Sequence, residues 1–336
     1  MSVIGTAFKG SPVLVTGASG FIGGHLALRL AGEEGAQVVG SGRSFKGDAE
    51  TKLRGAGVEL ARADLADAAA MERLCEGKSV VFHLAAWLMR GKGGDAEAYK
   101  INVDATRSLV QAASRAGVKR FVLVSSVAAY GLPPVDDIDE TVPIDISQPD
   151  LYGRTKALGE EAARDVAAGS GLSLSILRPA MVYGPGSAGW TVAMLRLVEK
   201  GVPVLLGDAS GHAFPVYIDD VVDALLLAGA RPEASGEAFN VSDASVTWET
   251  FFGYYGRMCG KNPRRVPMLF ARLIAAANEK FHLNIPLTAD RLKICVRKLR
   301  FPTAKAARLL GWKVSVPIGE GMRRSEVWLR ETGKLR

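Results

Sequence analysis

The chain has 336 residues, of which 48% are hydrophobic and 23% charged, a balance that is typical of a folded globular protein and excludes a disordered one. Three widely spaced cysteines (Cys75, Cys259 and Cys295) exclude a disulfide framework and a paired-cysteine metal site, and they fit a reducing, cytoplasmic compartment. The net charge of +7 is uneven, since residues 261–336 hold 18 Lys and Arg against 5 Asp and Glu, but these cations match no nucleic-acid-binding module, so nucleic acid is excluded as a partner.

Short apolar runs alternate with helix-like segments from residue 12 to about residue 180. We expect strands at Pro12–Thr16, Ala36–Gly40, Val58–Ala61, Val80–Ala85, Arg120–Ser125 and Leu172–Arg178. We expect helices at Gly23–Leu30, Ala66–Cys75, Asp95–Ala116 and Tyr152–Ala168. Strands that alternate with helices indicate βαβ units, so the sequence predicts an α/β fold of the Rossmann type, a doubly wound parallel sheet with helices on both faces.

The second half of the chain has a different pattern. Glycine- and proline-rich loops at Gly184–Gly189 and Gly207–Pro215 surround a helix over Thr191–Lys200, and a helix-rich tail follows from Thr247. Insertions after a doubly wound core usually lie over the carboxyl ends of the strands, where ligands bind. We therefore expect a cofactor domain and a smaller, mixed, helix-rich substrate lobe. The cofactor domain would comprise residues 1–180 and 212–245, and the lobe residues 181–211 and 246–336.

The segment TGASGFIG, from Thr16 to Gly23, joins the first expected strand to the first expected helix. Glycines allow a tight turn and a close approach of the backbone to a pyrophosphate, and the helix N-terminus offers free N–H groups to it. This position favours dinucleotide binding over a chance match. The residues expected to contact the dinucleotide are Gly17, Ser19, Gly20, Phe21, Ile22 and Gly23.

The loop resembles the TGxxGxxG motif of the extended short-chain dehydrogenase/reductases, the NAD(P)-dependent epimerase/dehydratase family. Three later segments also match that family: Arg178–Pro185, Phe214–Val221 and Asn240–Ser242. The match is specific over about residues 11–227. The resemblance implies further cofactor contacts at Asp64, Leu65, Leu84, Ala85, Ala86, Val124, Pro179 and Val182. His83 is better explained as a structural histidine than as a catalyst.

The end of the second strand bears on the choice between NAD and NADP. An acidic residue there would bond the ribose hydroxyls and repel a 2′-phosphate. Gly42 takes this position, and Arg43 follows it with a guanidinium that suits a 2′-phosphate. We expect NADP, with NAD as the alternative and a plain surface role for Arg43 as the simpler interpretation.

The reacting centre is predicted at Tyr152 and Lys156, a YxxxK pair one helical turn apart. A nearby ammonium and an oxidised nicotinamide would both favour phenolate, so Tyr152 could exchange a proton with the substrate oxygen, while Lys156 would hold the nicotinamide ribose. The family resemblance places the catalytic hydroxyl on Ser126, with Ser125 as the competitor. It also matches Asn102 to an asparagine that supports the lysine through backbone and water.

Two residues depart from the nucleotide-sugar enzymes of this family. Met181 replaces a common asparagine, and Ala213 replaces an arginine that grips a diphosphate. The residues that could line an apolar pocket instead are Trp87, Met89, Met181, Trp190 and Phe214. The tail, with Pro286-Leu287-Thr288 and the segment from Lys305 to Trp312, resembles the 3β-hydroxysteroid dehydrogenase-like branch, although sugar enzymes share part of this pattern.

These features favour an NAD(P)-dependent oxidoreductase that interconverts a secondary alcohol and a ketone on a small, fairly apolar substrate, as a 3β-hydroxysteroid dehydrogenase or a carbonyl reductase does. A nucleotide-sugar epimerase is the first alternative. Dehydration is disfavoured, because Val127 and Ala128 supply no acid/base pair beside Ser126. A non-catalytic NADP-binding sensor is the alternative from another class, and the set of Ser126, Tyr152 and Lys156 argues against it.

The expected partners are a small-molecule substrate and a second copy of the chain. The resemblance implies a homodimer built on the helices that carry Asn102 and Tyr152. A solvated basic face is the simplest interpretation of the C-terminal charge, and a weak contact with a membrane surface, near the apolar run Val266–Ala277, is the alternative. That run and Val221–Ala228 are too short to cross a bilayer, and the first twelve residues do not resemble a signal peptide.

Overall fold

The computed structural model describes residues 5–88, 94–243, 245–281 and 288–335. Its centre is a seven-stranded parallel sheet with the strand order β11-β6-β5-β4-β1-β2-β3. The strands are β1 (Pro12–Thr16), β2 (Gln37–Gly42), β3 (Glu59–Arg62), β4 (Val80–His83), β5 (Arg120–Val124), β6 (Ser173–Pro179) and β11 (Ala238–Val241). The predicted doubly wound sheet is therefore confirmed, and the crevice at its switch point lies between the carboxyl ends of β1 and β4.

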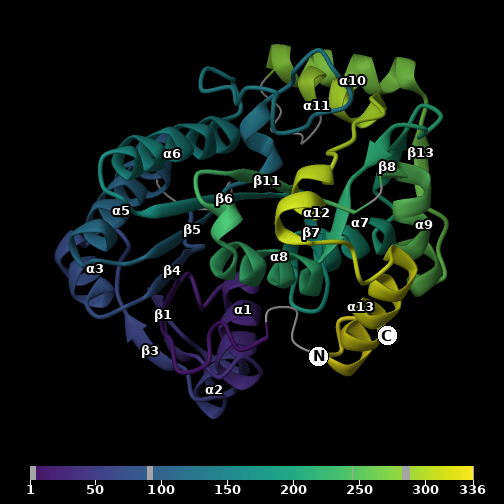
Figure 1. Ribbon diagram of the computed structural model, residues 1–336. Helices are drawn as coiled ribbons and strands as arrows, with labels where there is room; N and C mark the ends of the chain where they lie inside the picture. Colours follow the sequence, from purple (N-terminus) through teal and green to yellow (C-terminus); the bar gives the residue numbers. More distant parts are fainter. Residues whose placement is uncertain (1–4, 89–93, 244, 282–287, 336) are drawn as a thin grey trace.

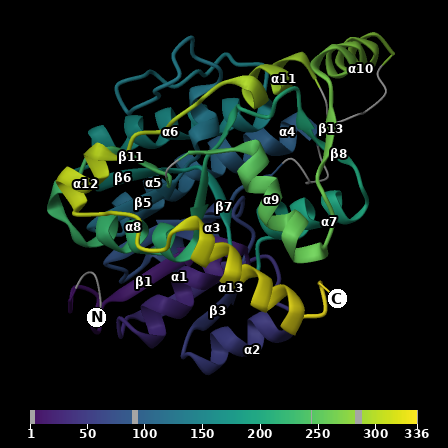
Figure 2. The same cartoon turned by 90° about the vertical axis from the view of Figure 1, so that its right-hand side faces the viewer.

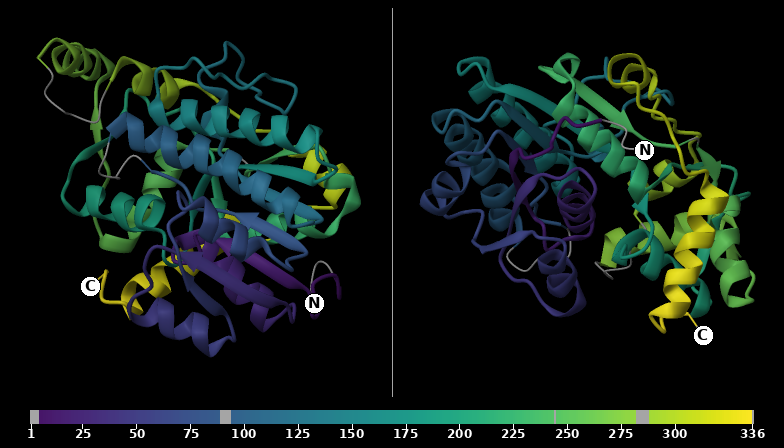
Figure 3. Two further views of the ribbon diagram at one scale, coloured as in Figure 1. Left: turned by 90° about the vertical axis from the view of Figure 1, so that its left-hand side faces the viewer. Right: turned by 60° about the horizontal axis from the view of Figure 1, so that its bottom comes forward.

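Helices cover both faces of this sheet (Figures 1 and 3). One face carries α3 (Ala68–Cys75), α5 (Ala105–Arg115) and α6 (Leu151–Ala168), and the other carries α1 (Phe21–Gly32) and α8 (Ile218–Ala230), with α2 (Gly47–Gly55) beside α1. Successive residues of a strand point to opposite faces. Accordingly, Val13 and Val15 of β1 belong to the core cluster on the α1 and α8 side, and Leu14 belongs to the cluster on the α3 and α5 side.

The helix expected over 95–116 is divided into three parts. These are α4 (Gly94–Tyr99), a π-helix at Lys100–Asp104 and α5. The π-helix carries Asn102, whose carbonyl oxygen would lie 2.4 Å from a Cβ placed on Gly159 of α6. The absence of a side chain at Gly159 thus lets α6 approach the widened turn, which is a feature that apolar spacing cannot predict.

The smaller lobe lies beside the carboxyl ends of the strands (Figure 2). Outside the central sheet, the short strands form three pairs, which are β7 (Met181–Tyr183) with β10 (Pro215–Tyr217), β8 (Pro203–Leu206) with β13 (Arg264–Val266), and β9 (His212–Ala213) with β12 (Val246–Thr247). The remaining α-helices are α7 (Met194–Glu199), α9 (Trp248–Cys259), α10 (Met268–Phe281), α11 (Ala289–Val296), α12 (Ala304–Leu310) and α13 (Ile318–Glu331). A π-helix at Ala188–Ala193 precedes α7, and a 3-10 helix at Pro232–Ala234 precedes β11. Within the described ranges, no helix has both the length and the apolar character needed to cross a membrane.

The C-terminal tail is fastened to the sheet domain through Asp220 at the start of α8. Ser315 donates to Asp220 Oδ1 from its backbone N–H at 2.7 Å and from its hydroxyl at 2.6 Å. The indole Nε1 of Trp312 donates to the carbonyl oxygen of Asp220 at 2.8 Å. Asp220 is fully buried, so these bonds supply the partners that a buried carboxylate needs.

Candidate active site

The glycine loop lies between β1 and α1, as expected, and is shaped by close backbone approaches. Gly17 has φ +73°, and a Cβ there would lie 2.7 Å from the backbone nitrogen of Ala85. A Cβ on Gly23 would lie 2.3 Å from the carbonyl oxygen of Gly17. Gly20 caps α1 without a side-chain hydrogen bond, and the first turn of α1 has no acidic residue. This cradle of glycines before a free helix N-terminus fits the pyrophosphate of a dinucleotide.

The loop is held against the end of β4. The hydroxyl of Thr16 accepts hydrogen bonds from the backbone N–H groups of Leu84 at 3.2 Å and of Ala85 at 3.3 Å. Leu84, Ala85 and Ala86 are all half-buried there. Thr16 was not predicted as a positioning residue, because its contacts with Leu84 and Ala85 arise from tertiary packing.

His83 is buried and has a partner on each ring nitrogen. Its Nδ1 lies 2.7 Å from Thr16 Oγ1, and its Nε2 lies 3.1 Å from Thr106 Oγ1. Burial, and then the charge of Lys156, lower the pKa of His83 to about 3, so the ring is neutral at pH 7. These contacts explain His83 as a structural histidine.

The end of β2 presents small residues and a cation. A Cβ on Gly42 would lie 2.6 Å from Ser19 Oγ, so a larger residue at this position would have to displace the serine hydroxyl. Arg43 follows it and is exposed. Arg62 of β3 lies opposite Gly42 in the parallel register and is a second cation at this edge, which sequence reasoning missed because the register joins distant segments. Beyond β3, Asp64 Oδ1 accepts the backbone N–H of Ala66 at 2.9 Å, and Leu65 is buried.

Tyr152 and Ser126 are brought together through their side-chain hydroxyl groups. Asp150 caps the N-terminus of α6 by accepting the N–H of Gly153 at 2.7 Å, and Tyr152 follows in the first turn. Ser126 caps the short 3-10 helix Val127–Tyr130, where its Oγ accepts the N–H of Ala128 at 3.1 Å. Ser125 is buried instead, and its N–H donates to the carbonyl of Leu177 at 2.8 Å. Ser126, and not Ser125, is therefore the serine next to Tyr152.

Lys156 lies one turn further along α6 and is buried. Its Nζ donates to the carbonyl oxygen of Val124, the last residue of β5, at 2.8 Å. Asn102 supports this region from the π-helix, because its Nδ2 donates to Thr155 Oγ1 at 3.0 Å and its Oδ1 accepts the N–H of Trp87 at 2.8 Å. The ammonium is thus directed to the carboxyl end of the sheet, where the ribose of a dinucleotide would lie.

Burial shifts the pKa values of Tyr152 and Lys156 in the directions that favour their neutral forms. It raises the pKa of Tyr152 to about 12, which the bond to Ser126 only partly opposes. It lowers the pKa of Lys156 to about 8, which the carboxylate of Glu160 partly opposes. Within the protein alone, Tyr152 is therefore a neutral phenol near pH 7, and the expected phenolate depends also on the charge of an oxidised nicotinamide. The neutral phenol suits proton donation to a substrate oxygen.

Three of the expected substrate residues lie in or against the apolar cluster beside β7 and β10. Met181 is buried, and its N–H donates to the carbonyl of Phe214 at 3.1 Å. Phe214 packs edge-on against Phe301, with 4.9 Å between ring centroids, and Trp190 packs against the same cluster. Trp87 packs on the other face with the α3 and α5 cluster, and Met89 lies outside the described residues.

The remaining expected cofactor contacts lie at strand ends. The carbonyl oxygen of Val124 accepts the hydrogen bond from Lys156, and Pro179 is the last residue of β6. The carbonyl oxygen of Val182 in β7 accepts a hydrogen bond from the hydroxyl of Ser187 at 3.1 Å. In the described part of the chain, no group of three or more His, Cys, Asp or Glu side chains could hold a metal ion.

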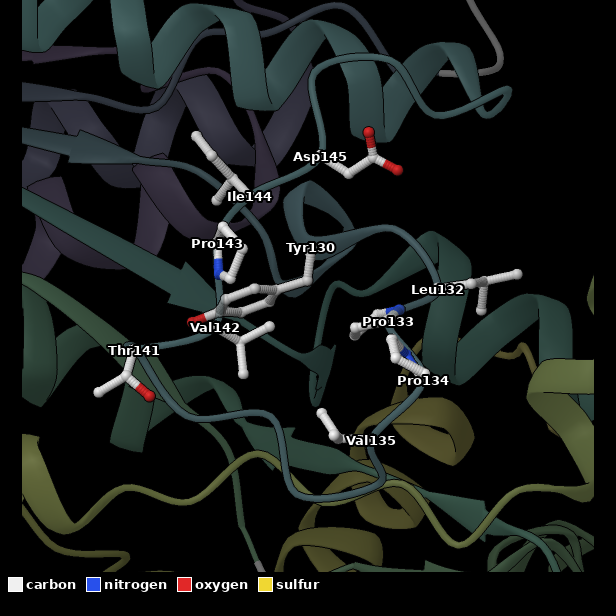
Figure 4. Close-up of a pocket in the computed structure, with 10 residues that line it drawn as sticks. All are labelled: Tyr130, Leu132, Pro133, Pro134, Val135, Thr141, Val142, Pro143, Ile144 and Asp145. Atoms are coloured by element: carbon white, nitrogen blue, oxygen red, sulfur yellow. The ribbon is translucent and has the colours of Figure 1, made fainter.

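A surface depression of about 690 Å³ lies next to this site, under the loop that follows Tyr130 (Figure 4). Figure 4 shows the Tyr130 ring between two segments of this loop, one with Pro143 and one with Pro133. The lining residues are Tyr130, Leu132, Pro133, Pro134, Val135, Thr141, Val142, Pro143, Ile144 and Asp145. Ser126, Tyr152 and Lys156 do not line it, so the depression neighbours the reacting groups without containing them.

Comparison with known proteins gives consistent matches. Residues 13–242 match the model of the NAD dependent epimerase/dehydratase family. A UDP-glucose 4-epimerase of Mycolicibacterium smegmatis is 32% identical over 94% of this chain and 98% of its own. A 3 beta-hydroxysteroid dehydrogenase/Delta 5-->4-isomerase of Mycobacterium tuberculosis is 29% identical over 90% of this chain and 85% of its own. Among solved structures, UDP-glucose 4-epimerase of Thermotoga maritima with UDP-glucose is 28% identical, with a TM-score of 0.78 over 96% of this chain and 99% of that one.

Proposed function

The chain belongs to the NAD dependent epimerase/dehydratase family of enzymes, and we propose that it is an oxidoreductase that interconverts a secondary alcohol and a ketone on a small, fairly apolar molecule. The bound nicotinamide supplies the hydride chemistry, and the protein supplies position and electrostatics. Residues 1–180 and 212–245 bind the cofactor in this proposal, and residues 181–211 and 246–336 bind the substrate.

Tyr152 is the proton donor and acceptor at the substrate oxygen. Its hydroxyl is neutral near pH 7, because burial raises its pKa to about 12, so it donates a proton to the oxygen of a ketone that is being reduced. Ser126, in contact with this hydroxyl, holds and orients the same oxygen by hydrogen bonding.

Lys156 binds the nicotinamide ribose and supports the charge of the site. Its ammonium is fixed at the end of β5 by the bond to Val124. In the oxidation direction, the phenol must lose its proton, and a cation beside it favours that loss. Asn102 positions α6 for this task through Thr155.

The proposed cofactor preference is NADP over NAD. Gly42 leaves no acidic side chain at the end of β2, and Arg43 and Arg62 place two guanidinium groups near that edge. A guanidinium binds a phosphate through charge-assisted hydrogen bonds, which the 2′-hydroxyl of NAD cannot supply in the same way.

The single observation that supports an apolar substrate is the chemistry of the cluster beside β7 and β10. Ala213 and Met181 are buried at the positions where nucleotide-sugar enzymes of the family commonly carry an arginine and an asparagine, and Phe214 and Trp190 pack nearby. A diphosphate here would lose charge-assisted bonds of roughly 1.5–3 kcal/mol each. An apolar ketone brings no charge into these surroundings, and its apolar surface gains from leaving water.

A nucleotide-sugar epimerase is the second candidate, favoured by the 32% identity to a UDP-glucose 4-epimerase. A ligand panel in a thermal-unfolding assay with cofactor present separates the two. We expect apolar cyclic ketones and sterol-like ligands to raise the melting temperature, and UDP- and GDP-sugars to leave it unchanged. The opposite pattern would favour the epimerase.

We also propose a homodimer, formed through α5 and α6, and a weak contact of the C-terminal lobe with an anionic membrane surface. The second proposal is supported by α10, which carries the exposed apolar side chains Leu269, Phe270, Leu273 and Phe281 and projects from the body in Figure 2. Cosedimentation of the chain with vesicles of phosphatidylcholine, with and without phosphatidylglycerol, tests this contact, and sedimentation equilibrium tests the dimer.

A further inference from the structure

A buried chain of charged and polar side chains runs from the catalytic helix to the edge strand of the sheet. Glu160 lies one turn after Lys156 on α6 and is fully buried. Arg178 of β6, also buried, donates from Nε to Glu160 Oε1 at 2.9 Å and from a terminal nitrogen to Oε2 at 2.6 Å. Both carboxylate oxygens of Glu160 are therefore taken by one guanidinium.

The other end of Arg178 is fixed as well. Its second terminal nitrogen donates to the hydroxyl of Tyr130 at 2.8 Å, and the guanidinium lies 4.7 Å from the centre of that ring. Tyr130 in turn donates to Asn240 Oδ1 at 2.8 Å, and Asn240 Nδ2 donates to the carbonyl of Ile138 at 2.8 Å. The guanidinium is held from two sides, so its hold on Glu160 has one geometry.

Lys156 is the cation that Glu160 would otherwise attract. The two residues are four apart on one helix, a spacing that places their side chains on the same face. The Lys156 ammonium nevertheless donates to Val124 at the end of β5. A free carboxylate in this buried position would compete strongly for the ammonium, because charges attract more strongly where water is excluded.

We propose that Arg178 is a positioning residue, which occupies both carboxylate oxygens of Glu160 and so keeps the Lys156 ammonium free for the cofactor ribose at the end of β5. This inference rests on the proposed function. In this arrangement Glu160 still contributes a distant negative charge that helps Lys156 stay protonated, whereas Arg178 prevents that charge from becoming a direct ion pair.

The charged groups around Lys156 allow the effects of Glu160 and Arg178 on its pKa to be told apart. His83 on β4 is neutral near pH 7, and Tyr152 on α6 is a neutral phenol, so Glu160 and, behind it, Arg178 are the charged groups that set the balance there. Removing the charge of Glu160 lowers the pKa of Lys156. Removing the charge of Arg178 raises that pKa. If the ion pair were merely structural, removing either charge would weaken cofactor binding in the same way, without opposite shifts in the pKa of Lys156.

The experiment compares wild type, Glu160→Gln, Arg178→Gln and the double variant. The dissociation constants of NADPH and NADH are measured by nicotinamide fluorescence from pH 6 to 10, below the melting temperature of each protein. In wild type, affinity should weaken as the pH passes about 8, where Lys156 loses its proton. Glu160→Gln should move this midpoint to lower pH, and Arg178→Gln to higher pH.

At pH 7, Arg178→Gln should weaken cofactor binding by about tenfold or more, since the captured ammonium no longer bonds the ribose. The double variant should recover most of that loss. If Arg178→Gln does not fold, Arg178→Lys takes its place: it retains the charge but leaves one carboxylate oxygen free, and it should show a smaller loss at pH 7.

Two results would overturn the proposal: equal directions of the midpoint shift in the two single variants, or unchanged affinity at pH 7 in the folded Arg178 variant. A wild-type protein that binds neither cofactor would instead remove the proposed function itself.

Discussion

Ser126 and Tyr152 come from a 3-10 helix after β5 and from the first turn of α6, and their hydroxyl groups are in contact. A phenol and an alcohol held together at the end of a parallel sheet can bind one substrate oxygen between them.

The first prediction concerns the phenol. Tyr152→Phe should lower kcat for ketone reduction by roughly 10²–10⁴-fold, because the variant has no proton to give. The dissociation constant of the cofactor should stay within about twofold, since the lysine remains. Tyr254→Phe, on α9 in the other lobe, is the matched control and should keep its activity. Steady-state rates with fluorescence titration of the cofactor decide the matter, and a Tyr152→Phe enzyme that retains turnover contradicts the role.

The second prediction concerns the choice of cofactor. Arg43→Ala should weaken NADPH by about 10–100-fold, the equivalent of one lost charge-assisted bond, and should change NADH little. The exposed Arg54, which bonds Glu50 at 3.1 Å, provides the control variant Arg54→Ala. Equal losses for the two cofactors would remove the argument for a 2′-phosphate site. A combined Arg43→Ala and Arg62→Ala variant shows whether the guanidinium of Arg62 also contributes to NADPH binding.

The sheet and the glycine loop could be predicted because their determinants are local. Each predicted strand is a short apolar run, and TGASGFIG occupies a fixed place between strand and helix. By contrast, α2 was missed, since it is polar and buries only Leu53. The π-helix around Asn102 was missed because apolar spacing records which face is buried and not how the backbone bonds. The pairing of Glu160 with Arg178 joins α6 to β6, and no spacing in the sequence indicates it.

The sequence indicated which residues form the candidate reacting centre, but not how burial shifts their pKa values. Tyr152 and Lys156 both lie on α6, at the spacing of one helical turn from which the motif was recognised. The motif does not show burial, which opposes charge on both side chains in the protein without cofactor. Contacts that form by tertiary packing, such as the hydrogen bond from Leu84 to Thr16, likewise could not be predicted from the sequence.

The third prediction compares two glycines of α1. A Cβ on Gly23 would lie 2.3 Å from the carbonyl oxygen of Gly17, whereas a Cβ on Gly32 would meet nothing within 4 Å. Gly23→Ala should distort the loop, lower stability by about 1–3 kcal/mol and weaken cofactor binding. Gly32→Ala should raise stability by up to about 1 kcal/mol, since alanine restricts the unfolded chain. Urea unfolding with cofactor titration measures both, and a harmless Gly23→Ala would contradict the close approach.

The fourth prediction concerns stability in acid. His83 is buried and neutral, and its pKa is lowered to about 3 against an ordinary value of 6.5. Between these values the unfolded chain binds a proton that the native protein does not, so stability is lost as the pH falls below about 6.5. From pH 6.5 to pH 4 this one residue should cost about 3 kcal/mol.

The test measures the free energy of unfolding of wild type and His83→Asn from pH 7 to pH 4. The asparagine preserves a partner for Thr16 but cannot take up a proton, so its stability should fall less steeply with acid, even if it starts lower at pH 7. Other buried groups such as Asp223, whose pKa burial raises to about 6, titrate in both proteins and cancel in the comparison. Parallel curves for the two proteins would mean that His83 can be protonated in the folded state and that its bonds to Thr16 and Thr106 do not hold it neutral.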